Sequence, residues 1–187
     1  MKNFPYIYPY IHPRRSASIN KGFTLIEIMV VIVIITLLAV IVLVNYRIVK
    51  KQFTLQRAAY KLAQDLRRAQ EMALSTKEMN GNIPDGYGIH FKKSWDDYYI
   101  LFADLNDNHH REAGDQDLEI IELEEGTKIL DLLPASSFSV LFSPPDPTVW
   151  IANLSTGTQA VITLCLEDDI TKTKVVEVNN AGLIEVK

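Results

Sequence analysis

The pattern of apolar and polar residues changes twice along the chain, and each segment predicts a different kind of element. Residues 28–44 form an uninterrupted apolar run in which Thr36 is the only polar side chain. About 20 apolar residues in a helix, at a rise of 1.5 Å per residue, span the hydrocarbon core of a bilayer. The run therefore predicts a helix of membrane length near the N-terminus.

Beyond Val44 the pattern becomes amphipathic. Apolar residues recur there at helical spacing, with charged residues on the other faces. They are Leu55, Ala58, Ala59, Leu62, Leu66, Ala69 and Ala73. No proline or glycine lies between Phe23 and Lys77, whereas Asn80-Gly81 and Pro84 follow and would end a helix. One continuous helix from about Thr24 to about Thr76 is predicted, and its small apolar residues would let a sheet approach closely.

From Tyr87 onward the apolar period shortens to two residues, which is typical of strands. Glycine, proline, asparagine and aspartate clusters separate the candidate strands, as expected of turns. The candidates are 87–91, 98–103, 118–123, 128–132, 138–142, 160–166, 174–178 and 183–186. One long helix followed only by strands predicts an α+β fold, with the helix packed on an antiparallel β-sheet domain.

The start of the apolar run carries a charge that membrane segments usually exclude. Glu27 lies there, soon after Gly22 and Phe23. Carboxylates within membrane segments are rare, normally have a partner and indicate function. A secretory signal would end in small residues suited to cleavage, but Asn45-Tyr46-Arg47 follows the run instead. A plain membrane anchor explains the length of the run but neither Gly22 nor Glu27.

The order of Lys21, Gly22, Phe23 and Glu27 before the apolar run resembles the start of the type IV pilin and type II secretion pseudopilin superfamily. The resemblance implies that a prepilin peptidase cuts between Gly22 and Phe23 and usually methylates the new amine of Phe23. It also implies that Glu27 meets the Phe23 amine of a neighbouring subunit during assembly. The physics agrees, because an ammonium and a carboxylate are each costly alone in a low dielectric. The alternative is that Glu27 reaches the membrane interface unpaired.

The resemblance divides the chain into four parts. Residues 1–22 are a cleaved prepilin leader and 23–44 a transmembrane and filament-core helix. Residues 45–77 are the amphipathic half of that helix, and 78–187 a β-rich globular domain. The expected partners are the prepilin peptidase, other pilin or pseudopilin subunits and the assembly platform of the inner membrane. The basic leader would stay in the cytoplasm, with the globular domain periplasmic or extracellular and the chain finally incorporated into a filament.

The globular part resembles the GspH/FimT group of minor pseudopilins and minor pilins. The resemblance rests on 87–91, 98–106, Gly114-Asp115 and 181–186 in this order after the helix. It implies a structural subunit that initiates or caps a type II secretion or type IV pilus filament, with no catalysis. No nucleophile elbow, Walker loop, CxxC or HExxH motif occurs in the sequence, and Cys165 is alone, which excludes an intrachain disulfide.

A polar segment after the second candidate strand has the oxygen spacing of a calcium loop. Asp104, Asn106, Asn108 and Asp115 are the candidate calcium ligands. The segment departs from the EF-hand pattern, since a histidine, His109, stands at the glycine position and Asp115 replaces the bidentate glutamate. The alternative is a polar connector between strands. His109 and His110 are expected to be solvated loop residues, and no cofactor other than calcium is expected.

The charge distribution bears on nucleic-acid binding. The net charge is −4, but the leader carries four of the 19 Lys and Arg residues and no acid, so the remainder has 15 basic and 23 acidic groups and a net charge of −8. Some members of the GspH/FimT group bind DNA through basic residues near the C-terminus. Here Lys187 is the only basic residue of the last nine, and Glu185 opposes it. A DNA-binding minor pilin of an uptake apparatus is therefore the alternative, and nucleic acid is not an expected partner.

Overall fold

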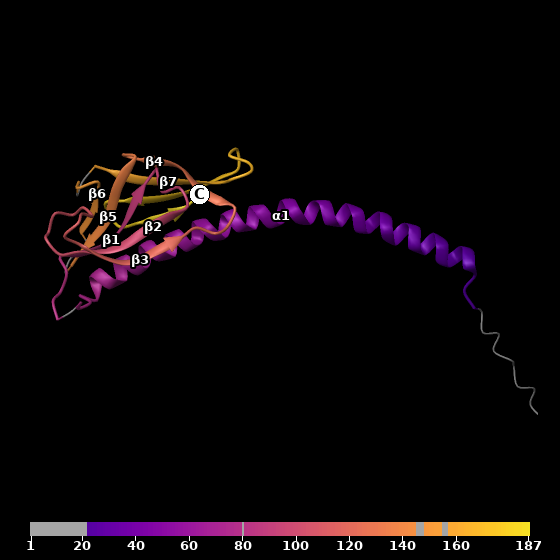
Figure 1. Cartoon of the computed structure of the whole chain (residues 1–187), viewed down its shortest axis with the longest axis horizontal. Helices are drawn as coiled ribbons and strands as arrows, with labels where there is room; N and C mark the ends of the chain where they lie inside the picture. The colour runs from indigo at the N-terminus through magenta and orange to yellow at the C-terminus, as the bar shows by residue number, and fades with distance from the viewer. Residues whose placement is uncertain (1–21, 80, 145–147, 155–156) are drawn as a thin grey trace, which may run out of the picture. The chain divides into compact units, whose positions relative to one another are not determined.

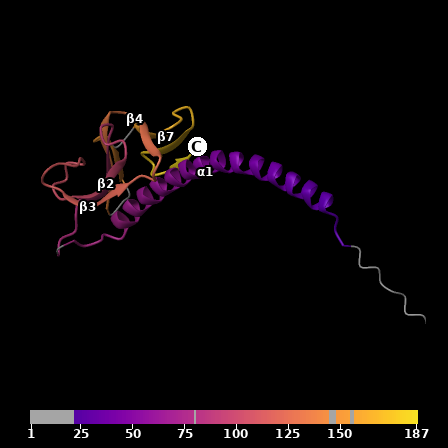
Figure 2. The same ribbon diagram turned by 45° about the vertical axis from the view of Figure 1, so that its right-hand side comes forward.

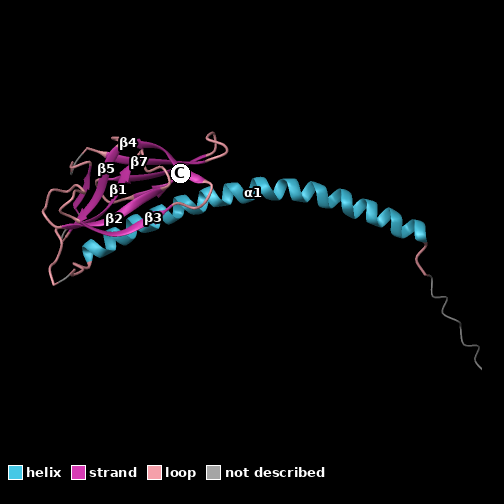
Figure 3. Ribbon diagram, viewed as in Figure 1, coloured by secondary structure: helices cyan, strands magenta, loops and turns pink. Residues whose placement is uncertain are grey.

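The computed structural model describes residues 22–79, 81–144, 148–154 and 157–187. The chain divides into two compact units, one ending at Leu43 and the other running from Val44 to Lys187. Helix α1 (Leu25–Leu74) is continuous in secondary structure and contributes residues to both units, and every strand belongs to the second (Figures 1 and 3). The predicted helix from Thr24 to Thr76 is thus confirmed to within two residues at each end.

Thr24 caps the N-terminus of α1. Its Oγ1 accepts a hydrogen bond from the backbone N–H of Glu27 at 3.2 Å, and its carbonyl accepts one from the N–H of Ile28 at 3.2 Å. A threonine cap satisfies one of the donors that the first turn leaves free. The helix begins where it does because this cap lies directly before the long apolar run.

Nine strands follow the helix and form two antiparallel sheets. The five-stranded sheet has the order β3-β2-β1-β5-β6 and the four-stranded sheet the order β4-β7-β8-β9. The strands are β1 (Gly86–Lys92), β2 (Tyr98–Asp104), β3 (Gln116–Glu122), β4 (Thr127–Leu133), β5 (Ser137–Ser143), β6 (Thr148–Ile151), β7 (Gln159–Leu166), β8 (Thr173–Asn179) and β9 (Ile184–Val186). All eight predicted strands are present. Strand β6 is not among the predicted strands; it has only four residues and follows a proline-rich stretch.

The core lies between α1 and both sheets. All the residues of the predicted sheet-facing side of the helix are buried, from Leu55 to Ala73. They form one cluster with alternate side chains of the strands, such as Tyr87, Ile89 and Phe91 of β1. Figures 1 and 2 both show the later half of α1 running alongside the strands. Burying each such leucine or phenylalanine contributes about 1.5–3 kcal/mol, so this interface accounts for much of the fold's stability.

Polar residues flanking the buried side of α1 attach it to edge strands of the two sheets. Lys61 Nζ donates to the carbonyl of Glu122 in β3 at 3.1 Å, and Arg67 Nη2 donates to the carbonyl of Ile184 in β9 at 3.4 Å. Edge strands expose unpaired backbone groups that other chains could bind. The helix therefore occupies part of both edges as well as covering the core.

Candidate functional site

The N-terminal unit presents an apolar surface that the chain itself does not cover. Leu25–Leu43 is the one stretch of the described chain long and apolar enough to cross a membrane, and none of it is buried within the molecule. Phe23, immediately before the helix, is also exposed. An apolar surface of this length is unfavourable in water, so it requires lipid or protein around it.

Glu27 lies in the first turn of this helix, where the positive end of the helix dipole favours a carboxylate. Within the described part of the chain, no lysine, arginine or histidine forms an ion pair with it. Its backbone N–H is satisfied by Thr24, but its carboxylate has no such partner among the hydrogen bonds of the described residues. Among the described residues, the carboxylate is therefore left without a partner.

Thr36 provides the contrast within the same helix. Its hydroxyl is 2.9 Å from the carbonyl oxygens of both Ile32 and Val33, to which it donates. Such bonds to the preceding turn satisfy a hydroxyl inside an apolar helix. The polar side chain in the middle of the run is thus satisfied locally, whereas the carboxylate at its start is not.

The start of this segment also initiates the helix. Thr24 and Glu27 have the Thr-x-x-Glu spacing of a capping box, and the structure contains the threonine half of that motif. This spacing could have located the first helical residue from the sequence alone. Glu27 therefore stands at a position that favours an acid for helix initiation as well as for any assembly contact.

A second exposed apolar surface lies on α1 within the C-terminal unit. Tyr46, Val49, Phe53 and Tyr60 are between 46% and 64% exposed and line a shallow hollow of about 570 Å³. Tyr46, Phe53 and Tyr60 recur every seven residues, so they face the same way, on the side of the helix opposite the buried leucines. We refer to these four residues as the aromatic stripe. The aromatic stripe is not among the features predicted from the sequence, although its heptad spacing is a detectable signal.

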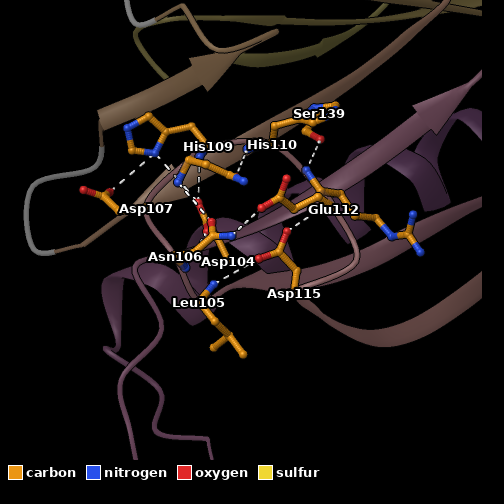
Figure 4. Close-up of polar contacts among 11 residues, drawn as sticks. Asp104, Leu105, Asn106, Asp107, His109, His110, Glu112, Asp115 and Ser139 are labelled. Atoms are coloured by element: carbon orange, nitrogen blue, oxygen red, sulfur yellow. Dashed lines mark hydrogen bonds and ion pairs between the residues drawn. The ribbon is translucent and has the colours of Figure 1, made fainter.

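The candidate calcium ligands are Asp104, the last residue of β2, and three residues of the β2–β3 loop, 105–115. The structure brings their oxygens onto the loop's own backbone (Figure 4). Asp104 is fully buried and accepts hydrogen bonds from the N–H groups of Asn106 at 3.1 Å and His109 at 2.8 Å. Asp115 accepts from Leu105 at 3.2 Å and from Glu112 at 2.8 Å. The carboxylates at both ends of the loop therefore hold its fold.

The two asparagines of the candidate site act in the same way. Asn106 Oδ1 accepts from the N–H of Asn108, and Asn108 Oδ1 accepts from the N–H of His110. Among the residues that the structure describes, no three His, Cys, Asp or Glu side chains are grouped so as to hold a metal ion. Calcium binding at Asp104, Asn106, Asn108 and Asp115 stays a prediction, and an ion there would compete with backbone donors for these oxygens.

The same loop covers the outer face of the five-stranded sheet, which corrects the expectation that its histidines are solvated. The His109 ring stacks on Trp150 of β6 with centroids 3.8 Å apart and planes at 25°. The His110 ring meets His90 of β1 edge-on at 5.6 Å, and the N–H of Arg111 donates to Ser139 Oγ of β5 at 3.3 Å. Both loop histidines are half-buried because they pack against these strands. The periodicity of the sequence does not reveal which strands lie beneath the loop.

His90 and Ser139, whose side chains meet on this face, are not an exposed catalytic pair. His90 Nδ1 lies 2.9 Å from Ser139 Oγ, and both residues are buried beneath the loop. Burial is the main cause that lowers the pKa of His90 to about 4, and neighbouring His110, Arg111 and Lys92 contribute to the same shift. A neutral, enclosed histidine that bonds two serine hydroxyls supports packing and offers no route to a substrate.

An ion pair holds the end of the loop against β3. Arg111 Nε and Nη2 each lie 2.6 Å from an oxygen of Asp117, and the guanidinium also lies over the Trp95 ring at 5.7 Å. The hydrogen bond from Arg111 lowers the pKa of Asp117. Bidentate pairs of this kind are more specific in geometry than single contacts. The loop is thereby fixed at Asp104, Asp115 and Arg111.

Comparison with known proteins bears on the N-terminal segment. Residues 18–43 match the family model described as the prokaryotic N-terminal methylation motif, which spans Gly22, Phe23 and Glu27. No curated protein matches the sequence.

Two crystal forms of the type IV minor pilin FimU from Pseudomonas aeruginosa strain PAO1 have a similar fold. One has a TM-score of 0.49 and 16% sequence identity, covering 71% of this chain and 87% of that chain. The other has a TM-score of 0.48 and 17% identity, covering 71% of this chain and 92% of that chain.

Proposed function

We propose that this chain, which by its N-terminal methylation motif belongs to the type IV pilin and pseudopilin superfamily, is a minor structural subunit of a cell-envelope filament. The observation that carries the proposal is the Glu27 carboxylate, which has no ion-pair partner in the described chain and begins an uncovered helix of membrane length. The filament of this proposal is either a type II secretion filament or a type IV pilus. Its central feature is assembly through the N-terminal segment.

Processing is the first step. A prepilin peptidase cuts between Gly22 and Phe23 and methylates the amine thus formed on Phe23. Gly22 adds no side chain at the bond that is cut, and an added Cβ there would have open space within the chain itself. The cut removes the basic leader and leaves an ammonium group at the start of the apolar helix. The mature chain then carries one positive and one negative group at that end, on Phe23 and Glu27.

Assembly is the second step. In an apolar filament core the Glu27 carboxylate of one subunit and the Phe23 ammonium of the next satisfy each other, since either charge alone is costly there. Before assembly the helix spans the cytoplasmic membrane, with the C-terminal unit outside the cytoplasm. The aromatic stripe gives α1 a further apolar face beyond the membrane segment. Neighbouring helices of the filament cover both surfaces.

The ion pairs of Lys187, at the C-terminus, and of Lys51, in α1, favour this role over DNA uptake. Lys187 is ion-paired with Glu177 and lies 3.9 Å from Glu185, and Lys51 Nζ is 2.6 Å from Asp168. These cations are neutralised by adjacent carboxylates, and phosphate contacts require free Lys and Arg groups. A phosphate backbone would have to displace those carboxylates.

The test compares two substitutions that each remove a polar group from the same apolar helix. Glu27→Val and Thr36→Val should both enter the membrane and be cleaved, because neither adds a polar group there. Only Glu27→Val should fail to appear in sheared filaments, since the Thr36 hydroxyl is satisfied within its own helix. Equal incorporation of both variants would show that the carboxylate is not the assembly contact.

A further inference from the structure

A shallow, open polar cavity lies where the β2–β3 loop meets the edge of the five-stranded sheet. Its volume is about 410 Å³, within the range of ~300–1,000 Å³ that is usual for small-molecule sites. It is separate from the N-terminal segment and from the aromatic stripe. Its polar lining comes from Asp85, Asp107, His109, Ser143, Thr148 and Trp150.

Three buried polar atoms of this lining have no hydrogen-bond partner. They are His109 Nδ1, Ser143 Oγ and Trp150 Nε1, and no other buried side-chain nitrogen or oxygen of the described residues is in this position. Carboxylates lie near the first of them, since His109 Nδ1 is 3.6 Å from Asp107 Oδ1 and 3.8 Å from Asp104 Oδ2, both beyond hydrogen-bond distance. Each unsatisfied buried group costs about 1–3 kcal/mol, so most proteins leave few of them. All three atoms belong to residues that line this one cavity, which is where a ligand would have to lie to supply the missing partners.

These atoms are held in place by regular structure. Ser143 ends β5 and pairs in register with Thr148 of β6, and Trp150 lies further along β6. His109 adopts a φ of 60°, its N–H is bonded to the buried Asp104 carboxylate, and its ring stacks on the Trp150 indole. A site built on strands and on a stacked ring is preorganised for binding.

The chemistry of the lining restricts the ligand. The Trp150 N–H can only donate, the Ser143 hydroxyl can donate and accept, and the Asp85 and Asp107 carboxylates accept. Two carboxylates repel an anion, and no lysine or arginine is among the described lining residues to offset them. An ammonium group offers no acceptor to Trp150, and an apolar molecule would leave all three atoms unsatisfied.

We propose that this cavity binds a neutral polyhydroxylated ligand, chemically a sugar residue. A hydroxyl both donates and accepts through one uncharged atom, so adjacent hydroxyls can accept from Trp150 Nε1–H and donate to the carboxylates. Another can bond Ser143 Oγ and His109 Nδ1. The proposal does not depend on the filament role, and a chain that fails the Glu27 test would still carry this site.

The first experiment titrates the full-length protein in lipid nanodiscs with neutral monosaccharides: glucose, galactose, mannose and N-acetylglucosamine. Alkyl glycoside detergents are avoided because their own sugar headgroups would compete. The chain has two tryptophans, so a Trp95→Phe background makes Trp150 the reporter of fluorescence. A saturable change in Trp150 emission with at least one sugar is expected. No saturation with any sugar, or saturation only with inorganic phosphate or a neutral glycine peptide, overturns the proposal.

The second experiment measures affinity calorimetrically in matched variants. Ser143→Ala and Trp150→Phe each remove one ligand hydrogen bond and should weaken binding roughly 3- to 10-fold. Ser137→Ala, on the same face of β5 but bonded to His90, should bind as the parent does. Ser143→Ala should also leave the melting temperature of the unliganded protein unchanged, because its hydroxyl has no partner to lose. Equal affinities in Ser143→Ala and Ser137→Ala would contradict the assignment.

Discussion

The Tyr99 hydroxyl donates a 2.7 Å hydrogen bond to the Asp65 carboxylate and so joins the C-terminal half of helix α1 to strand β2. The Tyr99 ring is fully buried, while Asp65 lies at the margin of the buried side of the helix. Burial raises the pKa of Tyr99 above its ordinary value, and the bond to Asp65 adds to the rise. Tyr99 is therefore a neutral donor at physiological pH.

Tyr99→Phe should lower the free energy of unfolding by about 1–2 kcal/mol, because Asp65 loses its donor and the ring stays packed. Tyr60→Phe, which removes a hydroxyl from the exposed side of the same helix, should change stability by less than about 0.5 kcal/mol. Urea unfolding followed by circular dichroism measures both values. Equal values for the two variants would show that the Tyr99–Asp65 bond does not stabilise the interface.

Leu62→Asp should unfold the C-terminal unit. Leu62 is fully buried between the helix and the sheets, and truncating a core leucine costs about 2–5 kcal/mol before the burial of a charge is added. That loss approaches the ~5–15 kcal/mol total stability of a typical domain. The control is Gln64→Asp, an exposed position nearby on the helix. The measurement is thermal melting of both variants in a fragment that begins at Lys51, which we expect to be soluble. Leu62→Asp should lose the folded-state transition that Gln64→Asp keeps. A melting curve like that of the parent for Leu62→Asp would refute the assigned core face.

The elements that the sequence predicts are those specified by local periodicity. The buried side of α1 from Leu55 to Ala73 follows from the 3.6-residue repeat, and eight strands follow from alternation and turn residues. Strand β6 was missed because a short run after prolines has too few residues to show a period. Its position is set by pairing with β5, through contacts such as Val140 with Ile151.

The sites beyond the N-terminus depend on contacts between distant segments. Nothing in the spacing of Asp85, His109, Ser143 and Trp150 predicts that they share a cavity, since the meeting requires both the β5–β6 register and the path of the loop. The loop histidines were expected in solvent for the same reason. The N-terminal motif could be recognised directly because all its residues lie within one short segment.

His90 should make stability depend on pH. Its pKa is about 4 in the folded protein, against about 6.5 in the unfolded chain, so between these values the unfolded chain binds more protons. Stability should therefore be complete above pH 6.5 and fall by up to about 3 kcal/mol as the pH drops to 4. The charges facing His90 are His110, Arg111 and Lys92, which lower its pKa, and Asp117, which raises it.

The measurement is chemical unfolding at several pH values for the parent and for His90→Gln. The variant carries no titrating ring, so its stability should decline less over this interval by about 2–3 kcal/mol. A parallel decline in both proteins would mean that other groups cause the acid sensitivity.

Calcium should have little effect on stability if the β2–β3 loop is a connector held by its own backbone. Ligand stabilisation follows RT ln(1 + [L]/Kd), and the loop's oxygens already accept backbone hydrogen bonds, so millimolar calcium should shift the melting temperature by less than about 1 °C. Asp104→Ala should cost about 2 kcal/mol or more without any ion, because two N–H donors lose their acceptor. The exposed Asp107→Ala is the control. A shift of several degrees that disappears in Asp104→Ala would instead establish the predicted calcium site.

The most direct test of the filament account is the intact mass of the chain purified from membranes of cells that contain a prepilin peptidase. The account predicts a chain that begins at Phe23 and is heavier by one methyl group, and it predicts that Gly22→Val leaves the precursor uncut. Ile28→Val, a conservative change beyond the cut, should be processed like the parent. A chain that retains its first 22 residues, or one that begins after Val44, would contradict the account.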